Sequence, residues 1–270
     1  MDIDAVNLTS GITVLAFMVS TWALSLVLRD ASIVDIAWAF GFVIVAWLVF
    51  AVGEGPIERR ALVAALITIW GLRLTAHMLT LRWGKGEDFR YRDMRARYGR
   101  RFPVVSLFSV YLFQALGMWA VSLPIQAAGA LPGPSGLTAL DLAGLSLWVV
   151  GMVFEVGGDR QLAQFRADPR NRGQVMDRGL WRYTRHPNYF GDWCVWWGVF
   201  VIALAADSPR AWWAIAGPLT MTLIFAKVFG VPLMEGHLAK TKPGYAEYVR
   251  RTSAFLPRPP KPSRHPAGEN

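Results

Sequence analysis

The sequence predicts an all-α, polytopic membrane protein with seven transmembrane helices, its N-terminus outside and its C-terminus in the cytoplasm. Of the 270 residues, 54% are hydrophobic and 17% are charged, which is too apolar for an ordinary soluble domain. Crossing a bilayer takes roughly 20 mainly apolar residues. The segments that meet this requirement are 8–28, 32–52, 61–81, 104–128, 139–159, 188–206 and 211–234.

The distribution of Lys and Arg predicts the orientation of these spans. Twenty-three of the 28 basic residues fall at Arg29, in loops 82–103 and 160–187, and in the tail after the last span. Cytoplasmic loops are enriched in Lys and Arg, so we expect all four positions to be cytoplasmic. We therefore interpret the net charge of +9 as loop charge and expect no nucleic-acid partner.

We expect one membrane domain over residues 1–256 and a disordered, proline-rich tail over 257–270. The location that fits this chain is a bacterial inner membrane, with the lipid bilayer as its surroundings. The single cysteine, Cys194, excludes an intramolecular disulfide, and we expect no bound metal. The sequence leaves the oligomeric state open.

Polar residues gather in the cytoplasmic half of five spans. They are Asp35, Arg73 and His77, Glu155 and Asp159, Asn188 and Asp192, and Lys227 with Glu235. Residues four apart share one helix face, and ionisable groups at such depth usually face a bundle interior and serve a site. We expect a pocket open to the cytoplasm. The alternative is that these charges only pair with each other, for example Asp35 with Arg73 or Asp192 with Lys227.

The run 179–192 places two arginines, a histidine, an asparagine and an acid at the start of the sixth span. Arg182 and Arg185 could bind phosphate oxygens in a bidentate manner, beside the favourable dipole of a helix N-terminus. The alternative is that His186-Pro187 only marks a helix start. Downstream, the basic amphipathic segment 244–257 could lie at the headgroups or cover the pocket.

These residues carry a resemblance to a known family. The stretch from about Gly151 to Pro257 resembles the C-terminal domain of steroid 5-alpha-reductases, with the clearest similarity over about 139–257. The motifs are Gly151-Met152 with Glu155, Asp159, Leu162 and Arg166, then Gly179-Leu180-Trp181-Arg182-Tyr183, Asn188, Gly191 and Asp192, and Tyr248 to Pro257. Weaker similarities are Ser32 to Trp38 and Trp70-Gly71-Leu72-Arg73.

The resemblance implies a seven-helix enzyme that uses NADPH to reduce a carbon–carbon double bond conjugated to a ketone, such as a 3-oxo-Δ4 steroid. An apolar or lipid substrate would enter from the membrane. The cofactor residues that it implies are Arg73, Glu155, Asp159, Leu162, Arg166, Tyr183, His186, Asn188, Asp192, Lys227 and Arg251. The acid near the ketone corresponds to Asp35, and its tyrosine partner corresponds by spacing to Trp70.

In this mechanism hydride adds to the β-carbon while an acid hydrogen-bonds the developing enolate oxygen. We expect Asp35 to be that acid, since a carboxyl among apolar neighbours can stay protonated. The alternative is an S-adenosylmethionine-dependent membrane methyltransferase of the isoprenylcysteine or phospholipid type, which shares the Arg185-His186-Pro187 motif. Such enzymes usually carry paired glutamates after the last span, whereas Met234-Glu235-Gly236-His237 gives only one acid here. A transporter or scaffold is a third possibility, disfavoured by the lack of repeat symmetry.

Overall fold

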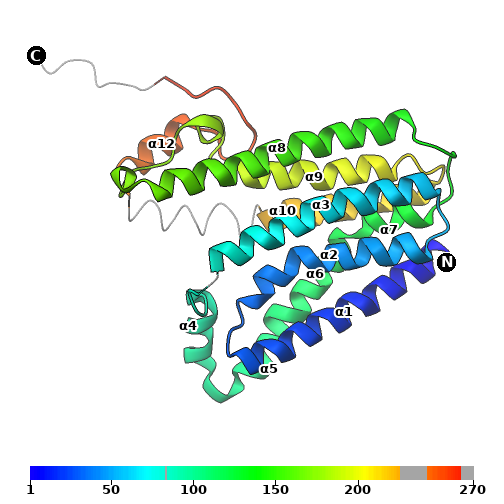
Figure 1. Ribbon diagram of the computed structural model, residues 1–270, viewed down its shortest axis with the longest axis horizontal. Helices are drawn as coiled ribbons and strands as arrows, with labels where there is room; N and C mark the ends of the chain where they lie inside the picture. Colours follow the sequence, from blue (N-terminus) through cyan, green and yellow to red (C-terminus); the bar gives the residue numbers. More distant parts are fainter. Residues whose placement is uncertain (83, 226–241, 263–270) are drawn as a thin grey trace, which may run out of the picture. The chain divides into compact units, whose positions relative to one another are not determined.

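The part of the chain that the structure describes is mainly helical and contains no β-strand. This computed structural model describes residues 1–82, 84–225 and 242–262. The long helices are α1 (Ile3–Leu28), α2 (Ile33–Val52), α3 (Ile57–Arg82), α8 (Ala139–Ala167) and α9 (Pro187–Ala203), and the shorter ones are α4 (Phe89–Tyr98), α5 (Phe102–Ser106), α6 (Phe113–Val121), α7 (Leu123–Ala130), α10 (Ala216–Leu223) and α12 (Tyr245–Arg251) (Figure 1). They are joined by the 3₁₀ helices η1 (Gly99–Arg101), η3 (Pro169–Asn171), η4 (Gly179–Arg182) and η5 (Pro209–Ile215) and by a π-helical stretch, η2 (Leu107–Leu112).

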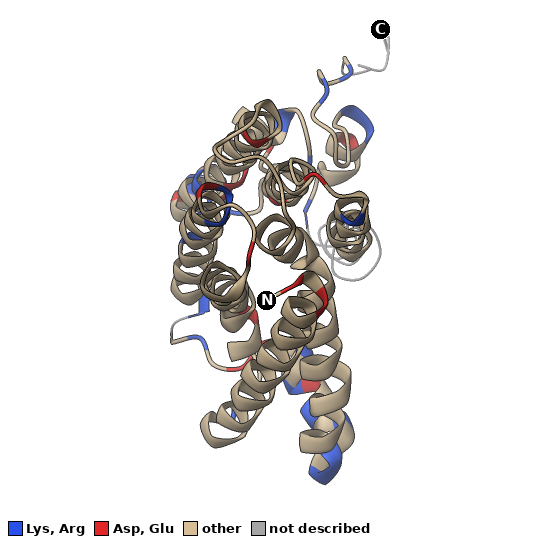
Figure 2. Ribbon diagram, turned by 90° about the vertical axis from the view of Figure 1, so that its right-hand side faces the viewer, with Lys and Arg blue, Asp and Glu red and all other residues tan. Residues whose placement is uncertain are grey.

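Five helical segments are long and apolar enough to cross a membrane. They are Ile3–Leu28, Ile33–Val52, Ile57–Arg82, Phe89–Val121 and Ala139–Ala167. Lys, Arg, Asp and Glu are concentrated near helix ends and in connections, and most of the helical length carries none of them (Figure 2). These segments support a protein embedded in the lipid bilayer, as the composition predicted.

Several observed elements differ from the expected spans, and α8 continues to Ala167, beyond the expected end at 159. The expected loop at 82–103 contains helix α4, whose N-cap Asp88 accepts a hydrogen bond from the backbone N–H of Arg90. The expected span 104–128 is divided at Ser122 between α6 and α7, where Pro124 opens the second helix. The expected span 211–234 begins as η5 and α10, and its part from 226 onward lies outside the described residues.

The chain divides into two compact units, Met1–Gly144 with Val199–Thr220, and Leu145–Gly198 with Met221–Asn270. In the first unit, α2 packs on α1 and α3. The contact with α3 depends on Gly71, where a Cβ atom would lie 2.5 Å from Cγ2 of Val43 and 3.0 Å from the carbonyl oxygen of Ala39. Phe42 and Trp70, both fully buried, meet edge to face beside this contact.

A buried ion pair links the N-terminal part of α3 to the first turn of α8 within the first unit. Nε of Arg59 donates to Oδ1 of Asp141 at 2.9 Å, and both side chains are fully buried. The backbone N–H and the hydroxyl of Thr138 also donate to Asp141, so the Asp141 carboxylate accepts hydrogen bonds from both residues. Buried ions are tolerated where they are paired and hydrogen-bonded in this way.

In the second unit, α8 and α9 pack against each other through glycines. A Cβ atom on Gly191 would lie 2.4 Å from the backbone nitrogen of Glu155, and one on Gly151 would lie 2.6 Å from the carbonyl oxygen of Gly191. Only hydrogen fits at either position. Small residues at a helix contact let two backbones approach closely within a membrane.

The second unit also includes the segment from 242 onward that the structure describes. Thr184 and Ser253 form an isolated parallel bridge, and the hydroxyl of Tyr248 donates to the carbonyl of Trp181 at 2.6 Å. Segment 244–257 therefore packs on the turn that precedes α9, a position that the sequence left open. Of the expected tail, residues 263–270 lie outside the described residues.

Candidate functional site

Asp35 lies at the centre of a polar network in the first unit. It occupies the first turn of α2, and its side chain is only 14% exposed. Its Oδ2 accepts from Arg90 at 2.7 Å and from Arg82 at 3.1 Å, and its Oδ1 accepts from the hydroxyl of Tyr91 at 3.1 Å. Asp35 therefore receives three donors, two of them positively charged, as a carboxylate does.

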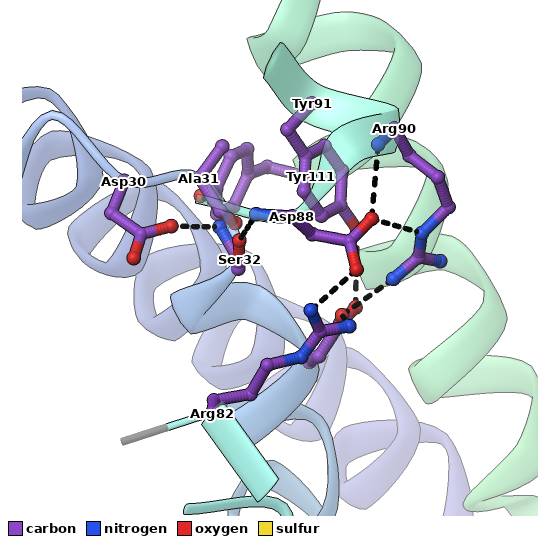
Figure 3. A network of polar contacts seen from close by, with 9 residues as sticks. Asp30, Ala31, Ser32, Arg82, Asp88, Arg90, Tyr91 and Tyr111 are labelled. Carbon is purple, nitrogen blue, oxygen red and sulfur yellow. Dashed lines mark hydrogen bonds and ion pairs between the residues drawn. The ribbon is translucent and has the colours of Figure 1, made fainter. Parts of the chain in front are cut away.

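Arg82 and Arg90, which both pair with Asp35, also contact a second acid, Asp88. Figure 3 shows both arginines at Asp88. Nε of Arg90 donates to Oδ1 of Asp88 at 2.8 Å, and Arg82 pairs with Oδ2 of the same residue. Two carboxylates and two guanidinium groups thus alternate around a closed ring. This ring joins the first turn of α2, the last turn of α3 and the beginning of α4.

The segment in front of α4 is also bonded to the turn between α1 and α2. The backbone N–H of Asp88 donates to Oγ of Ser32 at 2.6 Å, and that of Ala31 donates to Glu87 at 2.9 Å. Glu87 is paired in turn with Arg95 at 2.7 Å. These bonds fix the position of α4, and with it the positions of Arg90 and Tyr91.

The hydrogen-bond partners of Asp88 and Glu87 determine the pKa values of these two acids. Burial raises the pKa of Asp88, but hydrogen bonds from the side chain and backbone of Arg90 and from Arg82 outweigh it and lower the pKa to about 2. For Glu87, burial is likewise outweighed, here by Arg95 and the backbone of Ala31, and its pKa is lowered. Both acids are therefore ionised at neutral pH.

Tyr91 is the residue in this network that the sequence did not single out. It is 5% exposed, and Arg90 lies over its ring at 5.1 Å. Within the basic stretch 89–98, an aromatic residue flanked by arginines was the available signal. Tyr91 supplies a hydroxyl next to Asp35, which is the type of group expected at the position matched to Trp70.

The other predicted residues of the first unit lie along α3. Trp70 is fully buried against Phe42, twelve residues before Arg82. Arg73 is half-buried, one turn before His77 on the same helix. The ketone-binding role assigned to Trp70 stays a prediction.

In the second unit, the close contact between α8 and α9 gathers four of the predicted cofactor residues. Glu155 and Asp159 on α8 are buried, and so is Asp192 on α9. Nδ2 of Asn188 donates to Oδ1 of Asp159 at 3.1 Å. We expected residues four apart to share one helix face. The polar residues of α8 and α9 do lie at the contact between the two helices, where the amide of Asn188 meets the carboxylate of Asp159.

The turn before α9 has a structural role that the sequence did not specify. Arg185 is buried, its NH1 group donates to the carbonyls of Thr252 at 2.6 Å and Val249 at 3.2 Å, and its backbone N–H donates to Ser253. These carbonyls belong to the C-terminal end of α12. Cations are favoured at helix C-termini, so Arg185 holds the C-terminal end of α12 in place.

The remaining predicted residues of the second unit surround this turn. His186 is buried and stacks on Tyr189 with ring centroids 5.2 Å apart, whereas Tyr183 is 44% exposed. Arg251 pairs with Asp177 at 3.3 Å. Leu162 is half-buried and Arg166 is exposed on the last turns of α8. Lys227, with Glu235, lies outside the described residues.

Comparison with known proteins gives the family. The family described as "protein of unknown function (DUF1295)" matches residues 21–252, which is most of the chain. The chain belongs to the DUF1295 family. The matched range extends from the last third of α1 to the residue after α12. The Asp35 network and the polar residues between α8 and α9 therefore both lie within the family region of this DUF1295 protein.

The chain is also similar to a curated protein whose activity is not described. An uncharacterized protein of Schizosaccharomyces pombe is 24% identical over 264 residues, which cover 88% of this chain and 75% of that protein. No solved structure matches the chain. The family is associated with membrane proteins that resemble steroid 5-alpha-reductases.

Proposed function

We propose that this DUF1295 protein is an NADPH-dependent membrane reductase of a conjugated carbon–carbon double bond in an apolar enone, such as a 3-oxo-Δ4 steroid. The observation that carries the proposal is the hydrogen bond between Tyr91 and Asp35, held in place by two arginines at one end of the first unit. A phenol beside a carboxyl group is a recurring arrangement for stabilising an enolate oxygen.

The roles that we propose for Asp35 and Tyr91 differ from the expectation, in which Asp35 was the acid and Trp70 its partner. Asp35 is engaged by Arg82 and Arg90, which stabilise its negative charge, and it accepts the Tyr91 hydroxyl. We therefore assign the hydrogen bond to the ketone oxygen to Tyr91, whose single O–H would turn from Asp35 to the substrate when the enone binds, and we assign Asp35 the role of holding the phenol in place before that. The nearby guanidinium groups would stabilise the negative charge that develops on that oxygen.

The second unit provides groups that fit a nicotinamide cofactor, which when bound supplies the hydride. Asn188, Asp159, Glu155 and Asp192 offer an amide and carboxylates that can bind carboxamide and ribose hydroxyl groups. Arg166, exposed at the end of α8, suits a phosphate. The fit rests on this set of donors and acceptors, together with the cations around the turn before α9.

We further propose seven spans, with the N-terminus outside, the C-terminus in the cytoplasm and the site open to the cytoplasm of a bacterial inner membrane. Five helices that are long and apolar enough to cross a membrane support the polytopic part of this proposal. The sixth span would be α9, which has 17 residues, and the seventh would start with α10. The Asp35 network lies among the basic residues of segment 82–103, the side that the charge distribution assigns to the cytoplasm.

The proposal is tested by replacing Tyr91 with phenylalanine, which removes one hydroxyl and keeps the ring. We expect Tyr91→Phe to lower kcat by about 10²- to 10³-fold, the usual cost of losing one donor to a developing oxyanion. NADPH binding, measured as a rise in melting temperature of the detergent-purified protein, should be unchanged. Tyr98→Phe is the matched control, because Tyr98 is an exposed tyrosine of the same helix.

The same measurements distinguish the alternatives. A melting-temperature rise with S-adenosylmethionine and none with NADPH would replace the reductase by the methyltransferase. Full turnover in Tyr91→Phe, with NADPH still bound, would leave a reductase but remove Tyr91 from its mechanism.

A further inference from the structure

Helix α4 has one side that is bonded to the rest of the first unit and one side that is exposed. Arg90 and Tyr91 both donate to Asp35, and Arg95 pairs with Glu87. The exposed side consists of Phe89, Arg92, Asp93, Ala96 and Arg97. Positions three and four apart share one face of a helix, so these five residues form a continuous strip.

Four arginines on this strip and in the turn after it form no ion pair within the described residues. They are Arg92, Arg97, Arg100 and Arg101, and all four are exposed. We call them the arginine surface. Arg97 lies over the ring of Tyr98 at 5.7 Å, and the acid on the same strip is Asp93. Four positive charges against one negative charge make this surface complementary to an anionic partner.

The chain changes direction between α4 and the membrane segment that follows it. Gly99 ends α4 with a φ of 50°, which glycine adopts without strain. Beyond it, α5 and α6 run along a different line from α4 (Figure 1). With 10 residues, α4 is about 15 Å long, too short to cross a bilayer by itself. It is therefore a short helix attached to the end of a spanning segment.

The apolar side chains after Arg101 identify the surroundings of the arginine surface. Val104 is 60% exposed and Phe108 is 63% exposed. They lie three and seven positions after Arg101, so the three side chains share one helix face. Large apolar side chains that are exposed on a membrane helix face lipid tails. Arg101 therefore lies where the lipid-facing strip ends, and a long cationic side chain at that place extends to the headgroups.

Phe89 supports the same surroundings for α4. It is 60% exposed on the strip that carries Arg92 and Arg97. Short basic helices with an aromatic residue on the exposed face bind at the boundary between headgroups and acyl chains. A lipid surface accounts for both the arginines and the phenylalanine, whereas a polar, acidic partner would account only for the arginines.

We propose that the arginine surface binds the headgroups of anionic phospholipids, such as phosphatidylglycerol, with Phe89 inserted at the acyl boundary. Each guanidinium group offers a planar fork of donors that matches the oxygens of a lipid phosphate. The negative net charge of the headgroup gives a preference over phosphatidylcholine, which is neutral overall. The surface contains none of the residues assigned to substrate or cofactor, so it does not depend on the proposed function.

The test measures lipid binding by the purified full-length protein in detergent. Phosphatidylglycerol and phosphatidylcholine, each labelled on an acyl chain, are titrated with protein, and fluorescence anisotropy gives the two dissociation constants. The wild type should bind phosphatidylglycerol more tightly, and the preference should fall as salt is raised. Arg100→Gln/Arg101→Gln should weaken phosphatidylglycerol binding about 30-fold, since each basic residue near an anionic lipid surface contributes about fivefold. Phosphatidylcholine binding should be unchanged.

Two further double variants control for charge and for folding. Arg100→Lys/Arg101→Lys keeps both charges and should keep most of the preference. Arg170→Gln/Arg172→Gln removes two exposed charges from the loop after α8 and should change neither constant. The proposal is overturned if the wild type shows no preference, if Arg100→Gln/Arg101→Gln binds like the wild type, or if the loop variant loses binding equally. Displacement of phosphatidylglycerol by a short single-stranded RNA at similar concentration would indicate a nucleic acid instead.

A second measurement tests the depth of the surface in a bilayer. In a Cys194→Ser background, nitroxide labels are attached at Ala96→Cys and Phe108→Cys, and the protein is reconstituted into nanodiscs that contain phosphatidylglycerol. The label at 108 should collide with dissolved oxygen and be shielded from an aqueous nickel complex. The label at 96 should lie at headgroup depth. A label at 108 that is open to the nickel complex, or a label at 96 far out in water, would contradict the proposal.

Discussion

At the scale of single residues, the network around Asp35 shows how charge sets the function of an acid. The resemblance and the apolar residues around it in the sequence led us to expect Asp35 as a protonated acid. In the fold it lies between Arg82 and Arg90, with the hydroxyl of Tyr91 on its other oxygen. The partner residues come from α3 and α4, 47 to 56 positions away in the chain.

Asp88 gives a pH-dependent contribution to stability. Its folded pKa is about 2, against an ordinary value of 3.8, so the ionised form is stabilised by about 2 kcal/mol. Because the folded pKa is the lower one, this stabilisation is complete above about pH 4 and is lost as the pH falls toward 2. Asp88→Asn, which keeps the size of the side chain, should lower the free energy of unfolding by about that amount at pH 7.

The measurement is the thermal or denaturant unfolding of wild type and Asp88→Asn in detergent between pH 7 and pH 3. The difference between the two proteins should shrink toward the acid end. Asp93→Asn, at an exposed position of the same helix, should show little difference at any pH. A difference for Asp88→Asn that stays constant down to pH 3 would contradict the electrostatic explanation.

At the scale of elements, the bonding of Arg185 to the C-terminal end of α12 could not be predicted from the sequence. Arg185 and Arg182 belong to the same short motif and look equivalent in the sequence. The structure buries Arg185 at the carbonyl end of α12 and leaves Arg182 exposed. The difference arises because a helix end has unsatisfied carbonyls that need donors, and only one of the two arginines reaches them.

We expect Arg185→Gln to loosen α12, because it removes the charged donor from the carbonyls of Val249 and Thr252. Hydrogen exchange of amides in 245–253 should become roughly ten- to hundredfold faster, as follows from the loss of about 1.5–3 kcal/mol. Arg182→Gln should leave this exchange unchanged, since only its backbone carbonyl takes part, accepting from Thr252. Equal effects of the two substitutions would contradict the role assigned to Arg185.

At the scale of the whole molecule, the membrane topology is the property to be tested. Five helices are long and apolar enough to span, and the proposed arrangement has seven spans with the N-terminus outside. In a Cys194→Ser background, single cysteines at Glu58→Cys and Ser135→Cys should react with an impermeant maleimide in intact cells. Those at Lys85→Cys and Gln174→Cys should react only after permeabilisation, because the charge distribution assigns them to the cytoplasm. Labelling of all four positions in intact cells would exclude the proposed topology.

The sequence by itself determined the class of the protein, the main helices and the polar faces. Apolar runs of 20 or more residues leave few alternatives to a membrane helix, and α1, α2 and α3 begin and end within a few residues of the expected spans. The spacing of four also predicted correctly that Asp159 and Asn188 belong to polar helix faces, and these two residues meet across the contact of α8 with α9. These properties follow from local composition and helical periodicity.

Only the tertiary structure decided which charged groups meet. The ring of Asp35, Arg82, Asp88 and Arg90, the nearness of Tyr91 to Asp35, and the bonding of Arg185 to α12 all join segments that are far apart in the chain. Charge and periodicity give each segment a polar face but do not specify its partner. The partner is set by where helices approach each other, as at Gly71 and Gly191, and by the capping needs of helix ends brought there by the fold.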